Sequence, residues 1–463
     1  MKKTALIITL LGAICFAYGT SICLAQPKVP LGALPADTPD EVKEAVKQLY
    51  STDYKTQLAA IKELGKMGQE AAPAVPFLVS MMADRRYSTA GRALSRIGGA
   101  SFDPLLKALK HKDVRMRQMA ASALGGLDDS RAVEPLIESL KDPEIMTRAA
   151  NALARYRSDP RTTDLLIAGL NDKDVGRRRG AAYALQRVGD RRSADALIKG
   201  LKDKDAQVRA AIAAALGAMR ATEAAGPMIS LLKDKDETVR TEAAKALSKM
   251  KDTSAVEPLI EVLRKDPAPA VRKTAAETLG QLNDPRAVEP LVTAIEKDPD
   301  QAVKQQAARQ AAKFRSPHVF DLLVPLLKSR DSDVRECAAS TLVKLKNPRS
   351  LEYFVALLRD KEYSVRVQAA RGLASLGDAR AVEPLVKALR DEELLRETTS
   401  ALARLRDPRA VDPLIGMLGR AEGTQQRTIQ SALNRITGQN LGTEAARWRK
   451  WWKENKRLYG LKK

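Results

Sequence analysis

This chain contains few cysteine, histidine or aromatic residues. Its 463 residues include three cysteines, two histidines and 4% aromatic residues. Cys15 and Cys23 precede residue 25, so Cys337 would stand alone in a chain that lost that segment, which excludes an internal disulfide. His111 and His318 are far apart in the sequence, and neither belongs to a His-Glu pair, a Ser-His-Asp order or other catalytic motif. We therefore expect no metal, no cofactor and no enzymatic activity.

Long apolar runs are confined to the first residues. Lys2 and Lys3 precede an apolar run over residues 5–18, and small residues stand at positions −3 and −1 of a cut after Ala25. These features predict a secretory signal peptide over residues 1–25. The run is shorter than the roughly 20 residues that a membrane span needs. We expect a soluble bacterial protein exported to the periplasm or the extracellular space.

Charge of one sign dominates, with a formal net charge of +22. The excess is uneven, because residues 101–220 contain 23 Lys and Arg against 16 Asp and Glu, and residues 442–463 contain 8 against 2. Charges more than about 8 Å apart are largely screened at physiological salt, so these local concentrations matter more than the total. They favour an acidic partner.

The stretch from Lys251 to Leu282 is the unit that the chain repeats. Apolar residues at positions i, i+3, i+4 and i+7 predict a first helix, and a similar stripe predicts a second. The first stripe is Val256, Leu259, Ile260 and Leu263, and the second is Val271, Ala275, Leu279 and Leu282. Lys265-Asp266-Pro267 between them is typical of a turn.

About thirteen such units follow one another. The predicted organisation is a signal peptide (1–25), a proline-rich linker (26–37), the repeat array (38–438) and a C-terminal segment (439–463). A unit of this size cannot bury both of its apolar stripes alone, so neighbouring units must cover each other. First helices recur as AVEPL or AVDPL from Ala132, Ala255, Ala287, Ala381 and Ala410.

With these openings, the aspartate-bearing turns and a Val-Arg pair at the start of the second helix, the chain resembles the HEAT-repeat family, in its short bacterial phycobilisome-lyase-like form. The resemblance implies an all-α, right-handed superhelical solenoid with second helices on its concave face. The resemblance applies to the repeat, and we do not expect an exported chain to catalyse the bilin lyase reaction. Basic residues recur every 31 or 32 positions, at Arg178, Arg209, Arg240, Arg272, Lys304, Arg335 and Arg366.

The resemblance implies that these basic residues are structural rather than a binding track. Each is expected to pack between repeats and to bond a turn aspartate, with Asp174, Asp205, Asp236 and Asp333 as the receivers. Paired aspartates such as Asp172 and Asp174 also raise the alternative of a calcium loop. An EF-hand needs glycine at its sixth position, where this chain has Arg177. Turn formation and capping of the second helix explain these aspartates better.

The repeat is broken at Gly176-Arg177-Arg178-Arg179-Gly180. Arg177 occupies the position of Val208 in the next repeat, so charge replaces an apolar residue. One interpretation is a patch of guanidinium groups for an anionic partner. The other is a local shift of the helix start with a solvated, charged turn. The candidate partner-binding residues are Arg115, Arg117, Arg177, Arg178, Arg179, Arg187, Arg191 and Arg192.

A tryptophan-rich helix closes the chain. Trp448, Trp451 and Trp452 fall on one face, and the other faces are basic. The segment resembles the tails of other exported bacterial HEAT-repeat proteins. It can cap the apolar face of the last repeat, which is the interpretation that we favour, or lie at a membrane interface.

Together, these observations predict a non-enzymatic exported scaffold that binds another protein on the concave face of its solenoid, with the segment from Arg115 to Arg209 as the main contact region. The alternative is electrostatic binding of an acidic polymer, an anionic membrane surface or nucleic acid through a basic patch. Of these partners, nucleic acid is the least expected. The sequence does not define the oligomeric state.

Overall fold

The computed structural model describes residues 26–84 and 88–460. The predicted signal peptide and its cleavage position lie outside these residues. The described part of the chain is helical and contains no strand. None of its helices combines the length and hydropathy that crossing a bilayer requires. The chain divides into two compact units, one ending at Met228 and the other beginning at Ile229.

The first unit contains α2 (Asp40–Gln48), α3 (Tyr54–Met67), α4 (Val75–Met81), α5 (Ser88–Ile97), α6 (Phe102–Leu109), α7 (Val114–Leu124), α8 (Val133–Glu138), α9 (Met146–Leu153), α10 (Pro160–Gly169), α11 (Val175–Val188), α12 (Ala194–Gly200) and α13 (Ala206–Met219). The boundary falls within α14 (Ala225–Leu231).

The second unit continues with α15 (Glu237–Met250), α16 (Val256–Lys265), α17 (Pro269–Leu282), α18 (Val288–Lys297), α19 (Gln301–Ala311), α20 (Pro317–Leu323), α21 (Ser332–Leu345), α22 (Leu351–Leu357), α23 (Tyr363–Leu376), α24 (Val382–Ala388), α25 (Leu395–Leu405), α26 (Val411–Leu418), α27 (Gly423–Thr437) and α28 (Ala445–Asn455).

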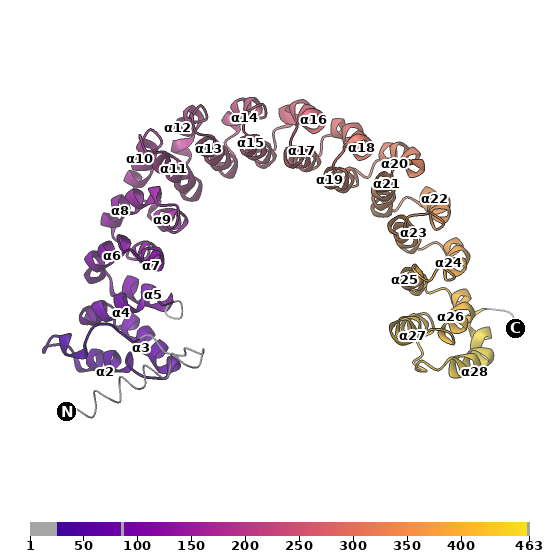
Figure 1. Cartoon of the computed structure of the whole chain (residues 1–463), viewed down its shortest axis with the longest axis horizontal. Helices are drawn as coiled ribbons and strands as arrows, with labels where there is room; N and C mark the ends of the chain where they lie inside the picture. The colour runs from indigo at the N-terminus through magenta and orange to yellow at the C-terminus, as the bar shows by residue number, and fades with distance from the viewer. Residues whose placement is uncertain (1–25, 85–87, 461–463) are drawn as a thin grey trace, which may run out of the picture. The chain divides into compact units, whose positions relative to one another are not determined.

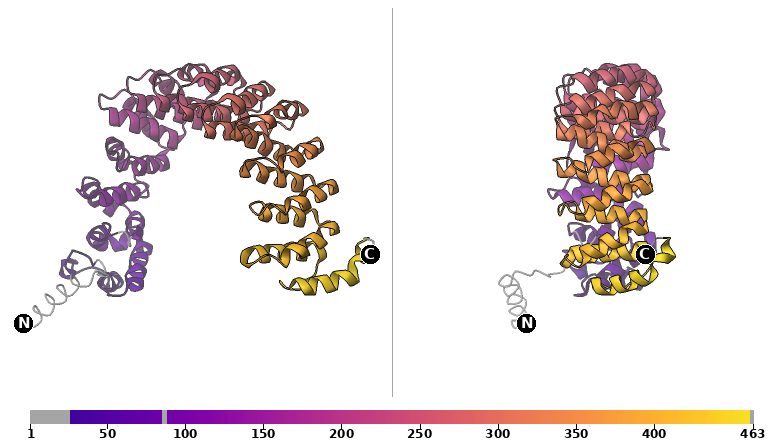
Figure 2. Two further views of the ribbon diagram at one scale, coloured as in Figure 1. Left: turned by 45° about the vertical axis from the view of Figure 1, so that its right-hand side comes forward. Right: turned by 90° about the vertical axis from the view of Figure 1, so that its right-hand side faces the viewer.

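These helices form thirteen consecutive pairs in the described part of the chain, from α2/α3 to α26/α27, which confirms the predicted repeat array. Within each unit the pairs form two layers (Figures 1 and 2). Within each unit, neighbouring second helices pack on each other, as α17 does on α15 and α19. First helices form the other layer, where α16 contacts α18.

The predicted reference repeat forms the expected pair, α16 and α17. All four residues of its first stripe are buried, as are Val271, Ala275 and Leu279 of the second; Leu282 is half-buried. The first helix is preceded by a 3-10 turn, η10 (Thr253–Ala255). The burial of both stripes depends on the neighbouring helix pairs, because a single pair cannot cover both of its apolar stripes.

The predicted linker, residues 26–37, hydrogen-bonds to the first helix pairs. The Gln26 side chain donates to the Tyr50 carbonyl oxygen over 2.9 Å, and the Lys28 amide donates to Ser80 Oγ over 3.2 Å. Pro27 is buried. These contacts tie the start of the described chain to the first repeats.

The turn aspartates cap the second helices, as predicted. The Asp174 carboxylate accepts the Arg177 amide of α11 over 2.9 Å, and Asp205 accepts the Val208 amide of α13 over 3.0 Å. A carboxylate at this position satisfies an amide that has no partner inside the helix. Among the described residues, no group of three or more His, Cys, Asp or Glu is arranged to hold a metal ion.

The regularly spaced basic residues join neighbouring repeats. In most repeats this residue forms an ion pair with the first aspartate of the next repeat's turn. We call this series the ladder. Its ion pairs include Arg117–Asp142 (2.9 Å), Arg178–Asp203 (2.7 Å), Arg240–Asp266 (2.6 Å), Arg272–Asp298 (2.8 Å), Lys304–Asp331, Arg335–Asp360 (2.7 Å) and Arg366–Asp391 (2.8 Å).

Each ladder arginine also bonds its own turn. In the reference repeat, Arg272 Nη1 donates to the carbonyl oxygens of Asp266 and Pro267 over 2.8 and 3.3 Å, while Nε and Nη2 hold Asp298. The pair is almost fully buried, with side-chain exposures of 8% for Arg272 and 4% for Asp298. The hydrogen bond to Asp298 raises the pKa of Arg272.

The structural role of the ladder was predicted correctly, but the aspartates predicted to accept its hydrogen bonds were wrong. Asp174, Asp205 and Asp236 cap helices and do not receive the ladder arginines, and Asp333 accepts a bond from Gln301 over 3.0 Å. The aspartate that pairs with a ladder arginine lies in the turn of the next repeat, two residues before the aspartate that caps the second helix there. Arg178, for example, pairs with Asp203. Burial alone would raise the pKa of Asp203. The hydrogen bonds from Arg178 and the Asp205 amide lower this pKa by more than burial raises it, so the net shift is downward.

Replacing Arg272 with alanine should destabilise the second unit by about 3 kcal/mol or more, because Asp298 would be left buried without its partner. Urea unfolding followed by circular dichroism measures the effect. Arg264→Ala, at an exposed position of α16, is the matched control and should change stability by less than about 0.5 kcal/mol. Equal unfolding midpoints for the two variants would contradict a structural role for the ladder.

Candidate functional site

Most of the predicted partner-binding arginines are engaged within the protein. Two of them, Arg117 and Arg178, are ladder residues. Arg191 pairs with Glu223 over 3.5 Å, and Arg192 pairs with Asp190 over 2.7 Å. Arg187 donates to the Asn151 side chain over 2.7 Å. These contacts engage most of the predicted arginines, so fewer of them are available to an anionic partner.

Arg177 also forms an internal ion pair. Its guanidinium contacts Glu138 of α8 and Asp172, the latter over 2.8 Å, and its side chain is 27% exposed. The predicted alternative, a shifted helix start, is wrong, because α11 begins directly after its capping aspartate just as α13 does. The charge at this position therefore bridges to the preceding repeat.

The two glycines around Arg177 allow a close approach. A Cβ at Gly180 would lie 2.7 Å from the Leu140 carbonyl oxygen, and one at Gly176 would lie 3.0 Å from that of Lys141. Both carbonyls belong to η6 (Ser139–Lys141), a 3-10 turn that packs on α11. The broken repeat pattern thus has a packing cause. Arg115 and Arg179 lie half-buried on α7 and α11.

The tryptophan-rich segment forms α28, which packs on α26. Trp448 and Trp452 are 0% and 2% exposed, and Trp451 is half-buried. Trp448 Nε1 donates to the Gly442 carbonyl oxygen over 2.8 Å. Tyr459, whose ring lies 5.3 Å from that of Trp452, donates its hydroxyl to the Thr437 carbonyl oxygen over 2.8 Å. Two of the three indoles are therefore turned inward, the arrangement that a cap requires.

Truncating Trp448 to alanine should lower the stability of the second unit by about 3–5 kcal/mol, because it removes a fully buried indole. Urea unfolding measures the loss, and Lys450→Ala on the exposed side of α28 is the control. Tryptophan fluorescence of the unmodified protein should not shift when anionic vesicles are added. A vesicle-induced blue shift, together with a small effect of Trp448→Ala, would instead favour the membrane interpretation.

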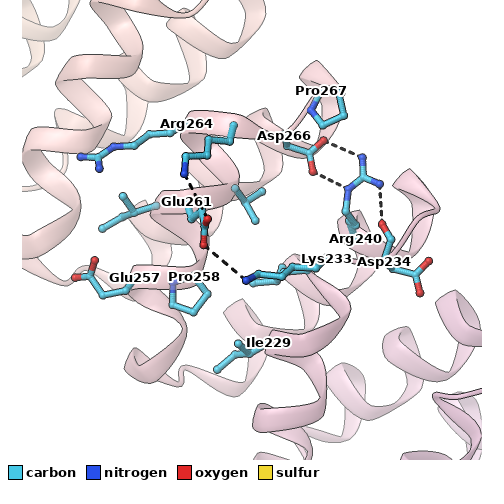
Figure 3. A pocket seen from close by; sticks show the side chains of 14 residues that line it. Ile229, Lys233, Asp234, Arg240, Glu257, Pro258, Glu261, Arg264, Asp266 and Pro267 are labelled. Atoms are coloured by element: carbon cyan, nitrogen blue, oxygen red, sulfur yellow. Dashed lines mark hydrogen bonds and ion pairs between the residues drawn. The ribbon is translucent and has the colours of Figure 1, made fainter.

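The grooves of the first-helix layer repeat along the chain. One of about 880 Å³ lies between the end of α14 and α16 (Figure 3). Several of its charges are paired within the lining, since Glu261 contacts Lys233 at 3.9 Å and Lys265 at 3.6 Å, and Arg240 holds Asp266. An equivalent groove with Arg272 at the same position lies one repeat further. We attribute these grooves to the repeat itself.

From α18 to α27, charge is segregated between the two helix layers of the second unit. The first helices α18, α20, α22, α24 and α26 contain six acidic and two basic residues, whereas the second helices α19, α21, α23, α25 and α27 contain three acidic and ten basic ones. Sequence windows missed this distribution because each window averages the two helices of a pair. A count restricted to second helices would have found it.

Six of these ten basic residues are exposed and form no ion pair with a carboxylate among the described residues. We call them the exposed row, and they are Arg309, Lys344, Arg371, Arg404, Arg427 and Arg435. The other four are the ladder residues of α19, α21 and α23 and Arg396, which holds Glu397. Although Lys344 is exposed, partial desolvation of its ammonium group and the nearby Arg309 charge lower its pKa.

A groove of about 420 Å³ lies on the second-helix layer between α25 and α27. Three members of the exposed row line it, with small and hydroxyl side chains between them. Its lining is Thr399, Ser400, Ala403, Arg404, Arg427, Thr428, Ser431, Ala432 and Arg435. The Thr399 hydroxyl is buried and has no hydrogen-bond partner.

Cys337 does not form a reactive centre. It is 4% exposed in α21, and burial raises its pKa to about 12. A thiol becomes nucleophilic as its thiolate, which this environment disfavours. The residue therefore packs as a small core side chain.

Paired helices stacked in two layers, with an interlocking ladder, define an α-solenoid. A family model described as HEAT repeats matches residues 84–154, 102–186, 141–217, 194–280, 230–301, 288–366 and 354–434. These matches span more than half of the chain, so the protein belongs to the HEAT-repeat family. HEAT solenoids are typically non-catalytic scaffolds, and those such as the importins bind protein partners.

The solved structure of yeast importin-beta supports the same fold. Yeast importin-beta (Kap95p) is 11% identical, with a TM-score of 0.55 over 91% of this chain and 70% of its own. The complex of CpcE and CpcF of phycocyanin lyase from a Nostoc species is 26% identical over 49% of this chain and 92% of that one, with a TM-score of 0.31. None of the curated proteins matches the chain in sequence.

Proposed function

We propose that this protein is an exported, non-enzymatic scaffold that binds another protein on its layer of second helices. The observation that carries the proposal is the exposed row, because unpaired cations on one layer are available to a partner while those of the ladder are not. Membership of the HEAT-repeat family supports a scaffold role.

The packing of the layers supports the second helices as the concave side. Neighbouring second helices contact each other more extensively than neighbouring first helices do, as α17 and α19 show against α16 and α18. Closer spacing on one side of a stack bends it toward that side. A partner seated there could contact several repeats at once.

The electrostatic alternative has its own support, since the same exposed row would attract an acidic polymer, an anionic membrane surface or nucleic acid. Such binding weakens steeply as salt rises and has little preference for one partner. The buried indoles of α28 favour the protein scaffold over membrane binding. Salt dependence and partner selectivity separate the two functions.

Immobilised protein should capture a saturable protein partner from cell-envelope extract across a range of salt concentrations. Reversing two cations of the exposed row, Lys344→Glu with Arg371→Glu, should abolish capture. The matched control, Arg359→Glu with Arg390→Glu, makes the same charge change at exposed positions outside the second helices of that unit and should retain it. Capture of no saturable protein at any salt concentration would refute the scaffold function.

Export predicts a defined mature terminus. Protein recovered from the envelope or medium of the producing cells should begin at Gln26, and mass spectrometry of the intact chain measures this. An Ala25→Arg variant, which removes the small residue at the cut, should accumulate with the leader attached. Full-length wild-type protein found only inside the cells would contradict export.

A further inference from the structure

The groove between α25 and α27 differs from the grooves of the first-helix layer in its charge balance. Three arginines line it, and no carboxylate does. The groove beside α16, by contrast, is lined by four basic and four acidic residues, and Glu261 and Asp266 form ion pairs with cations of that lining. Three unneutralised cations around one hollow repel each other, so an anion placed there lowers the free energy of the site.

The arginines are arranged across two neighbouring helices. Arg427 and Arg435 are eight residues apart on α27, which places their attachment points about 12 Å apart along the helix axis. Arg404 comes from α25, which packs directly on α27. A bound anion would therefore contact arginines of both helices. Because two of these arginines are spaced along the axis of α27, the site suits an elongated ligand.

The spacing matches an extended peptide. Side chains four residues apart in an extended strand stand about 13 Å apart on one face, close to the separation of Arg427 and Arg435. Guanidinium groups match carboxylates bidentately. The hydroxyls of Ser400, Thr428 and Ser431 line the space between. Those of Ser400 and Thr428 donate to carbonyl oxygens of their own helices, so they can accept a bond from a peptide N–H, while that of Ser431 can accept or donate one.

Nucleic acid fits the groove less well. Proteins that hold single strands stack the bases on aromatic side chains, and none lines this groove. A membrane surface presents its charges on a broad plane, whereas this site is a hollow between two helices. The exposed row extends the positive charge over α19, α21 and α23, so a longer acidic segment could continue across those repeats.

We propose that the groove between α25 and α27 binds an extended, carboxylate-rich peptide segment of a partner protein, with Arg404, Arg427 and Arg435 as the residues that hold its carboxylates. This inference rests on the proposed scaffold function, because it names the site and the class of segment through which that function would act.

Fluorescence anisotropy with the whole purified protein tests the site. The probe is a labelled peptide of about 12 residues with glutamate at alternate positions. A peptide with glutamine at those positions is its control. Arg404→Gln with Arg435→Gln should weaken binding of the glutamate peptide by about tenfold or more. The matched pair Arg359→Gln with Arg390→Gln removes the same charge outside the second-helix layer and should change binding by less than about twofold.

Several outcomes would overturn the assignment. Equal weakening by both variant pairs would mean that total charge, and not the groove, attracts the peptide. Equal binding of the glutamate and glutamine peptides would show that the groove does not recognise carboxylates. Tighter binding of single-stranded DNA of the same charge, lost in the groove variant, would assign the site to nucleic acid. Circular dichroism confirms that each variant is folded before it is compared.

The partner-capture experiment separates this inference from the function on which it rests. If the Arg404→Gln, Arg435→Gln variant still captures the envelope partner in full, the groove assignment fails and the scaffold function stands. If the unmodified protein captures no partner and binds no glutamate peptide, both fail. Loss of capture and loss of peptide binding in this variant alone support both.

Discussion

The arginine–aspartate pair between successive repeats is the interaction on which the stacking depends. In the reference repeat, one guanidinium holds the carbonyls of its own turn and the carboxylate of the next turn, so a single side chain fixes two repeats to each other. Because Arg272 and Asp298 are both buried, their attraction is offset by a desolvation penalty. We infer that the pair mainly sets the register between repeats, while apolar burial supplies most of the stability.

Close helix packing complements the ladder. Small residues on the second helices allow neighbouring backbones to approach, and a Cβ at Gly125 would lie 2.7 Å from the Ala152 Cα. The same requirement explains Gly180, which sits against the turn at Leu140. A glycine that breaks the repeat pattern can therefore mark a tight contact, and Arg177 beside it is used to bridge to Glu138.

The sequence was sufficient for the helix pairs, their number and the structural role of the ladder, because apolar periodicity and regular spacing are local signals. It was not sufficient for the ladder's receivers. Asp203 and Asp205 differ by two positions and are chemically alike, and their roles separate only when the helix is built. Helix capping distinguishes the two aspartates, because the carboxylate that caps its own helix is already engaged and the other one is left for the arginine.

The candidate site could not be found from charge counts, because a count does not record which cations have partners. Arg178 and Arg192 raise the charge of the first unit but are held by Asp203 and Asp190. Residues 395–437, which include Arg404 and Arg435, contain seven basic and four acidic residues, a smaller excess than the 23 against 16 of residues 101–220, so a count along the sequence does not single them out. A solenoid assigns alternate helices to opposite layers, so from α18 to α27 the second helices contain ten basic and three acidic residues while the first helices contain two basic and six acidic ones. An anionic partner encounters a single layer, so the charge that governs its binding is that of the second helices and not that of the chain.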